Sequence, residues 1–161
     1  MHTDQDKLYE LLSEFSNAMF VTHTRSGDLH TRPMRIAELT KEGELCFVTS
    51  NQSPKVREIA QDAHVALIFQ ASSKFVSLRG TAVVEQDPER LDRLWNEAWK
   101  VWFPKGKSDP NIRIMRILPR EAEYWDNEGM EGLSYAFAAV KAYIQGEQPH
   151  VDSDQHGKVK L

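Results

Sequence analysis

Short runs of β-branched and aromatic residues, joined by glycine-containing turns of about three residues, fill the region from Ala18 to Ser50 of this 161-residue chain. Three such runs lie at 18–24, 29–39 and 44–50. A parallel strand pair needs a crossover of a dozen or more residues, so turns this short can join only antiparallel strands. The region therefore predicts an antiparallel meander rather than a series of strand–helix–strand units.

Further strands are expected later in the chain. Segments 64–71 and 74–86 are rich in apolar residues and are separated by two serines, which predicts a hairpin. Segments 112–119 and 121–127 predict one or two final strands, with a break at Pro119 because proline cannot donate a hydrogen bond to a sheet.

Helices are expected between and around these strands. Apolar residues at helical spacing predict a short helix over 8–15, and Ser53 followed by Pro54 is typical of a helix start. A second Asp-Pro start and a long apolar stripe predict a helix over 88–102, and a last helix is expected to begin near Met130.

These elements do not alternate regularly, which favours a mainly β fold. We predict a six- to seven-stranded antiparallel β-barrel with helices packed outside it. The length suits one domain over residues 1–146. Residues 147–161 are polar and without apolar periodicity, so they are expected to form a mobile tail.

Composition excludes several function classes. The 20 Lys and Arg against 24 Asp and Glu give a net charge of −4, which favours neither nucleic acid nor an anionic membrane. Cys46 is the one cysteine, so neither an intramolecular disulfide nor a cysteine zinc cluster can form. The longest apolar run, 135–140, is far shorter than the roughly 20 residues of a membrane helix. With an acidic start in place of a signal peptide, the protein is expected to be cytoplasmic.

Common catalytic and metal-binding motifs are absent from the sequence. It contains no G-x-S-x-G elbow, no phosphate-binding P-loop and no G-x-G-x-x-G turn. Its six histidines form neither H-E-x-x-H nor a helical pair four residues apart, so no metal site is predicted. Cys46 lies within an apolar strand, where a thiol is expected simply to pack.

One candidate for an anion site is the passage from strand to helix at residues 49–55. A helix N-terminus offers unpaired N–H groups, and Thr49, Ser53 and Lys55 can add further donors. The alternative is a well-capped helix with one surface lysine.

Two other features could contribute to a binding site. Pro33 within a strand implies a sheet edge, a bulge or a place where another group meets the backbone, and Arg32 beside it carries a planar cation suited to phosphate. Among the aromatic residues, Trp102, Phe103 and Trp125 could cover a flat ring system, whereas Trp95 and Trp99 are expected in core or subunit-interface packing.

These residues, in this order, resemble one protein family. The segments that carry the resemblance are HTRPM, FVTSNQSPKVREI, W(x3)WxxWFPKGKSDP and PREAEYWD. They resemble the flavin mononucleotide (FMN)-binding split-barrel family related to pyridoxamine 5'-phosphate oxidase, in particular its general-stress-protein branch. The resemblance extends from Leu8 to about Ile144.

The resemblance implies a homodimer that holds two FMN molecules at the subunit interface. It places an arginine near the FMN phosphate and a tryptophan that reaches the flavin from the neighbouring subunit. Together with the anion site, it gives these expected cofactor-binding residues: Arg32, Pro33, Met34, Val48, Thr49, Ser53, Lys55 and Trp125.

The chain departs from the oxidase pattern at three places. Pro54 replaces a phosphate-binding arginine, and Phe75 falls where the oxidase has a flavin-contacting glutamine. Residues 126–131 are acidic where the oxidase has an R-x-H cluster that grips its phosphorylated substrate. Because an acidic segment repels such a substrate, this departure argues against pyridoxamine phosphate oxidation.

The expected function is therefore that of an FMN-dependent oxidoreductase with a stress-response role, whose substrate and electron donor the sequence leaves open. One alternative is a non-enzymatic flavin-binding or stress-protective protein. Another is a split barrel that binds haem, FAD or a deazaflavin.

Overall fold

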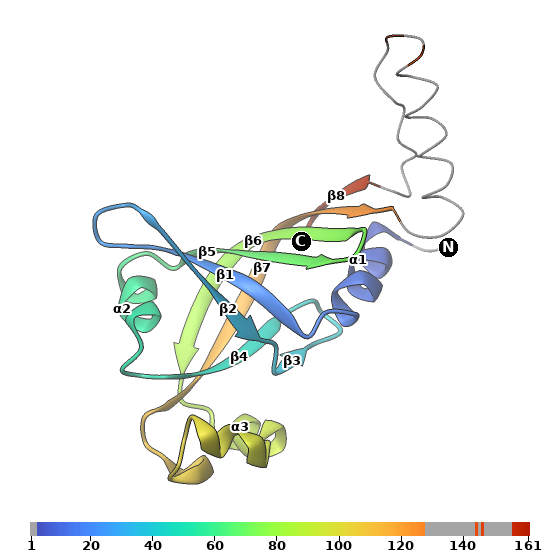
Figure 1. Cartoon of the computed structure of the whole chain (residues 1–161). Helices are drawn as coiled ribbons and strands as arrows, with labels where there is room; N and C mark the ends of the chain where they lie inside the picture. Colours follow the sequence, from blue (N-terminus) through green and yellow to red (C-terminus); the bar gives the residue numbers. More distant parts are fainter. Residues whose placement is uncertain (1–2, 128–143, 145, 147–155) are drawn as a thin grey trace.

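The computed structural model describes residues 3–127, 144, 146 and 156–161. In this part of the chain the strands form one antiparallel sheet in the order β2-β1-β5-β6-β7-β4-β3, and β8 pairs with β7 beside this path (Figure 1). The strands are β1 (Asn17–His23), β2 (Leu29–Arg35), β3 (Glu38–Leu39), β4 (Leu45–Ser50), β5 (His64–Ala71), β6 (Lys74–Glu85), β7 (Ile112–Asp126) and β8 (His156–Lys160). The helices are α1 (Asp4–Ser13), α2 (Pro54–Gln61) and α3 (Pro88–Leu94), with short 3-10 helices η1 (Glu97–Val101) and η2 (Gly106–Ser108).

The sheet curls so that its two edges meet at one corner. The chain leaves β2, which pairs with β1, and enters β3, which pairs with β4 at the other end of the sheet. At the crossing, the Ile36 N–H donates to the Ser16 carbonyl at 3.0 Å and the Ala37 N–H donates to the Cys46 carbonyl at 2.8 Å. The prediction of one strand over 29–39 was therefore wrong, because the two halves of this run pair with opposite edges of the curled sheet.

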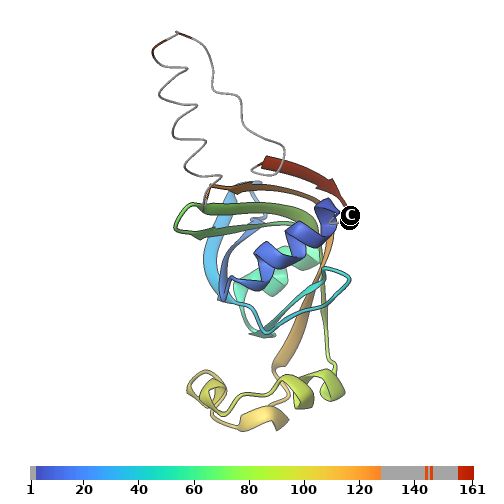
Figure 2. The same ribbon diagram turned by 90° about the vertical axis from the view of Figure 1, so that its right-hand side faces the viewer.

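The hydrophobic core fills the inner face of the curled sheet. Phe20 and Phe47 meet edge to face with their ring centroids 5.5 Å apart, and both are fully buried. The apolar face of α1 lies against this core. Figure 2 shows this helix lying across the curled sheet. A capping box between Thr3 and Asp6 fixes the start of α1.

β7 runs unbroken through Pro119, in contrast to the predicted break. The register shifts between Arg79 and Gly80 of β6, which pair with Glu121 and Pro119, so Arg120 is the extra residue of a bulge in β7 beside the proline. A side chain at Gly80 would place its Cβ only 2.3 Å from the Leu118 carbonyl oxygen. The bulge and the glycine together let a proline lie inside a long strand.

The predicted helix over 88–102 divides into α3 and η1. α3 ends at Leu94, and Trp95 has a non-helical conformation with ψ of 133°. The side chain of Asn96 accepts a hydrogen bond from the Ala98 N–H at 2.9 Å and so starts the new turn. This local bond competes with a continuous helix, and the segment from α3 to η2 forms a small lobe beside the barrel (Figures 1 and 2).

The expected mobile tail is wrong for residues 156–160, because they form β8. This strand pairs with residues 121–125 of β7 and buries Val159. Gly157 lies against the Tyr124 ring, where an added Cβ would be 2.4 Å from Cε1. The helix expected to begin near Met130 lies outside the described residues.

In the residues that the structure describes, no helix is long and apolar enough to cross a membrane. Within the same part of the chain, no three His, Cys, Asp or Glu side chains are grouped so as to hold a metal ion.

Candidate functional site

A cavity of about 480 Å³ lies between β2, β4, the start of α2 and the lobe. We call it the edge cleft. It is lined by Pro33, Met34, Arg35, Ala37, Val48, Thr49, Ser50, Ser53, Lys55, Trp99, Trp102 and Phe103. Six of the eight cofactor-binding residues predicted from the sequence line it, and Arg32 and Trp125 do not.

Lys55 is the cation at the α2 side of the cleft. Its ammonium donates to Thr49 Oγ1 at 3.1 Å and to Ser53 Oγ at 2.6 Å. Burial and the nearby Arg32 charge lower the pKa of Lys55, and Glu58 acts against this shift. Within the described residues no carboxylate forms an ion pair with Lys55. A half-buried cation held only by neutral hydroxyls is well placed to accept an anion.

Ser53 and Pro54 occupy the first positions of α2, as the sequence predicted. Ser53 is the N-cap residue, but its side chain forms no hydrogen bond to the helix backbone. Its hydroxyl instead accepts from Lys55, so the helix start and the lysine form one polar corner of the edge cleft.

Arg32 faces a different partner. Its guanidinium donates to Thr22 Oγ1 at 2.7 Å and to Glu58 Oε2 at 2.8 Å. Burial acts to raise the pKa of Glu58, but hydrogen bonds from His30, Thr22 and Arg32, with the Arg32 charge, lower it to about 2. Glu58 is thus a carboxylate at neutral pH and compensates the charge of Arg32. The sequence alone did not predict this ion pair, because the two residues lie 26 positions apart.

Trp125 lies near the far end of β7 from the edge cleft. Val48 and Thr49 pair with Ile114 and Arg113 at the start of β7, whereas Trp125 lies 11 residues beyond Ile114, about 36 Å along the strand. Its indole stacks on the His156 ring with centroids 5.2 Å apart. Trp125 of the same chain therefore does not reach the cleft.

Three aromatic residues of the lobe form one wall of the edge cleft. Trp102 is 78% exposed, whereas Phe103 is buried. Trp99 packs edge to face on Trp95, with ring centroids 5.7 Å apart. The predicted ring-covering positions Trp102 and Phe103 are thus in the cleft, and Trp99, which was expected only to pack, lines it as well.

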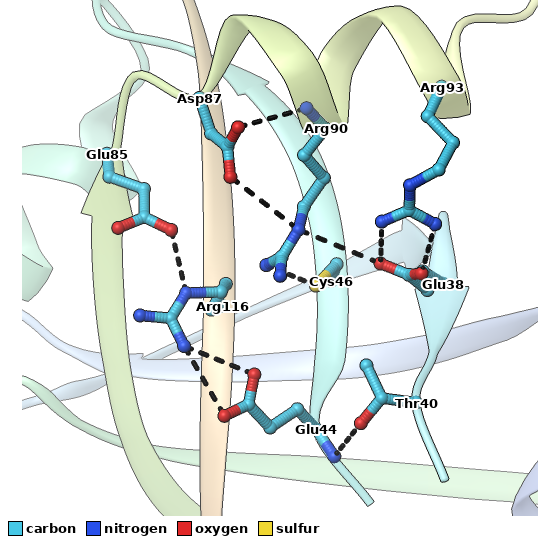
Figure 3. A network of polar contacts seen from close by, with 9 residues as sticks. All are labelled: Glu38, Thr40, Glu44, Cys46, Glu85, Asp87, Arg90, Arg93 and Arg116. Carbon is cyan, nitrogen blue, oxygen red and sulfur yellow. Dashed lines mark hydrogen bonds and ion pairs between the residues drawn. The ribbon is translucent and has the colours of Figure 1, made fainter. Parts of the chain in front are cut away.

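Ion pairs attach this lobe to the barrel. Figure 3 shows Arg90 and Arg93 of α3 reaching Glu38 of β3. Arg93 is bidentate, with Nη1 at 2.6 Å and Nη2 at 3.3 Å from the two Glu38 oxygens. In the same network, burial raises the pKa of Cys46 to about 11, so its thiol stays protonated and is not a nucleophile.

Replacing Glu38 with glutamine is expected to loosen the aromatic wall. The variant loses the charge that holds α3, which contributes about 1 kcal/mol and corresponds to about fivefold more frequent opening of the lobe. Limited trypsin digestion should then cleave after the lobe lysines about five times faster than in the unmodified protein.

The control is Glu44→Gln, which removes an ion pair to Arg116 in the same network without touching α3. Equal cleavage rates in the two variants would contradict the role of Glu38.

Comparison with known proteins shows the family of this chain. Residues 3–150 match the family described as pyridoxamine 5'-phosphate oxidase like. The protein bli-3 of Neurospora crassa is 26% identical over 117 residues, which cover 66% of this chain and 56% of bli-3, so the chain spans about half of that relative's length.

Solved structures of similar shape come from bacterial stress proteins. A general stress FMN/FAD-binding protein of Xanthomonas citri is 29% identical, with a TM-score of 0.67 over 78% of this chain and 89% of that one. A Clostridium acetobutylicum protein related to general stress protein 26 has a TM-score of 0.69 over 98% of this chain and 94% of its own, at 14% identity. The fold is the split barrel of these proteins, and the chain belongs to the pyridoxamine 5'-phosphate oxidase-like family.

Proposed function

We propose that the edge cleft binds FMN and that the protein is an FMN-dependent oxidoreductase. The observation that carries this proposal is Lys55, a half-buried cation held only by hydroxyls, in a cleft whose other wall is aromatic. In this arrangement Lys55 and Thr49 hold the phosphate, and Trp102 and Phe103 face the ring system. The similarity to a structure described as FMN/FAD-binding supports the same assignment.

When bound, FMN supplies hydride or electron transfer. Among the described residues that line the cleft there is no His, Asp, Glu, Cys or Tyr, and Lys55 is assigned to the phosphate, so this lining offers no further general acid or base. Its own contribution is to hold the phosphate, orient the ring and exclude water from the apolar wall of Pro33, Met34 and Val48.

This lack of an acid or base within the lining favours a second candidate, a flavin-binding protein without turnover. The two are separated by following oxidation of NADH and NADPH by the FMN-loaded protein. An oxidoreductase reduces its flavin with a saturable dependence on one of the donors, whereas a flavin carrier reduces slowly and without saturation.

We also propose that the working unit is a homodimer. An exposed apolar patch covers the outer face of β2, β1 and β5, where Leu29, Met19 and Ile68 are 66%, 41% and 47% exposed. Met19 pairs directly with Ile68 on one side and with Pro33 on the other, so the patch continues into the edge cleft. A second copy docked on this patch would bring its own residues, such as Trp125, to the cleft.

Ile68→Asp is expected to convert the dimer into a monomer, because it buries a charge in the proposed interface. Sedimentation velocity should show the change in mass, and FMN affinity should fall with it. Val101→Asp, which charges an apolar residue that is 78% exposed on the lobe, is the matched control and should leave the mass unchanged. A monomeric unmodified protein would disprove the dimer.

A melting experiment tests FMN binding itself. At a free FMN concentration 100 times the dissociation constant, binding stabilises the fold by about 2.7 kcal/mol. For a chain of this size we expect the melting temperature to rise by about 5 to 10 °C. The proposal fails if the purified protein is colourless and FMN leaves its melting temperature unchanged.

A further inference from the structure

The edge cleft is lined by two charged side chains, and both are cationic. One is Lys55 and the other is Arg35 at the end of β2. Among the described residues, no carboxylate lines the cleft. In the described part of the chain, the exposed Arg35 side chain forms neither an ion pair nor a hydrogen bond. Its charge is therefore available to a ligand.

Arg35 differs in this respect from Arg32. Because side chains alternate along a strand, residues three apart project from opposite faces of β2. The inward Arg32 is neutralised by Glu58, with Nη2 at 2.8 Å from Oε2. Arg35 projects outward, where no acidic side chain of the cleft meets it.

The corner where the sheet edges meet brings the end of β2, with Arg35, beside β4. At this corner Ala37 donates to the Cys46 carbonyl at 2.8 Å. Arg35 precedes Ala37 by two residues on one wall, and Val48 follows Cys46 by two residues on the other, so both lie about 7 Å from the corner. Thr49, which binds Lys55, comes next. Arg35 and Lys55 thus line one cavity from β2 and from α2.

We infer that Arg35 is the second cation that holds the anionic group of the cleft ligand, together with Lys55. The inference rests on the proposed FMN function and names the phosphate as the group that Arg35 contacts. A guanidinium suits this role because its planar fork can donate two hydrogen bonds to one phosphate. Arg35 then compensates for the phosphate-binding arginine that Pro54 replaces.

The test compares dissociation constants for FMN and for riboflavin, which lacks the phosphate, by quenching of flavin fluorescence. Arg35→Gln should weaken FMN binding by about 10-fold or more and leave riboflavin binding within about twofold. Arg35→Lys should restore part of the loss. Arg25→Gln, which removes an exposed arginine from the β1–β2 turn outside the cleft, should change neither constant.

Two outcomes would overturn the inference. An unchanged FMN constant in Arg35→Gln would mean that Arg35 does not contact the phosphate, and equal weakening of both flavins would mean that it supports the ring instead. If the proposed function itself is wrong, the unmodified protein will bind neither flavin, so this result differs from both outcomes above. Melting temperature checks that each variant is folded, and Arg35→Gln should match the unmodified protein without ligand.

Discussion

Replacing Lys55 with alanine is expected to weaken FMN binding by about 10- to 100-fold. The variant loses the one ammonium group at the α2 side of the edge cleft, and charge-assisted hydrogen bonds to phosphate contribute about 1.5 to 3 kcal/mol. Thr49 and Ser53 remain and can still donate from their hydroxyls, so binding is weakened rather than abolished. Flavin fluorescence titration measures the effect.

The control for this variant is Lys41→Ala, which removes an exposed lysine from the β3–β4 turn and should leave FMN affinity unchanged. Riboflavin affinity should also be unchanged in Lys55→Ala, because the lysine is assigned to the phosphate. If Lys55→Ala bound FMN as tightly as the unmodified protein, the phosphate would lie elsewhere.

Replacing Glu58 with glutamine is expected to lower the free energy of unfolding by about 3 kcal/mol at pH 7. The folded-state pKa of Glu58 is about 2, below its ordinary value of 4.5. A carboxyl whose pKa is lowered in the folded state stabilises the fold at pH values above its ordinary pKa. This contribution is lost as the pH falls through the folded-state pKa. The difference between Glu58→Gln and the unmodified protein should therefore shrink to about 1.5 kcal/mol at pH 3.

Urea denaturation at the two pH values measures this difference. Asp62→Asn is the control, because it makes the same chemical change on an exposed carboxylate at the end of the same helix. Its effect should be much smaller than that of Glu58→Gln at both pH values, because solvent screens an exposed charge. A cost for Glu58→Gln that does not depend on pH would show that packing, not charge, explains the loss.

Local chemistry in the sequence identified most elements of the fold. An edge was one of the positions that Pro33 predicted, and β2 is an edge strand because, among the described strands, it pairs with β1 alone. The two-serine turn predicted the β5–β6 hairpin, and Ser72 there adopts a positive φ of 49°. Ser53 and Pro54 marked the start of α2 correctly. Each of these signals depends only on neighbouring residues.

Features that depend on distant residues were not predictable in the same way. The division of the 29–39 run follows from closure of the sheet at Ala37 and Cys46, for which the run itself carries no signal. β8 has one buried apolar residue, Val159, and its stability comes from pairing with β7.

The same distinction applies to the candidate site. The grouping of Lys55 with Thr49 and Ser53 was predictable because these residues lie within six positions of one another, whereas the pairing of Arg32 with Glu58 joins β2 to α2 across the fold. Arg35 was missed because an exposed arginine in a strand resembles any other surface charge. Its place in the cleft appears only when β2 and β4 are brought together at the corner.

The central claim is that the edge cleft recognises FMN through its phosphate. Calorimetric titration of the full chain with FMN and, separately, with riboflavin tests it most directly. We expect saturable binding of one FMN per chain, at least about 10-fold tighter than riboflavin, since one or more charge-assisted bonds distinguish the two ligands. Equal affinities for the two flavins, or no saturable binding of FMN, would contradict the claim.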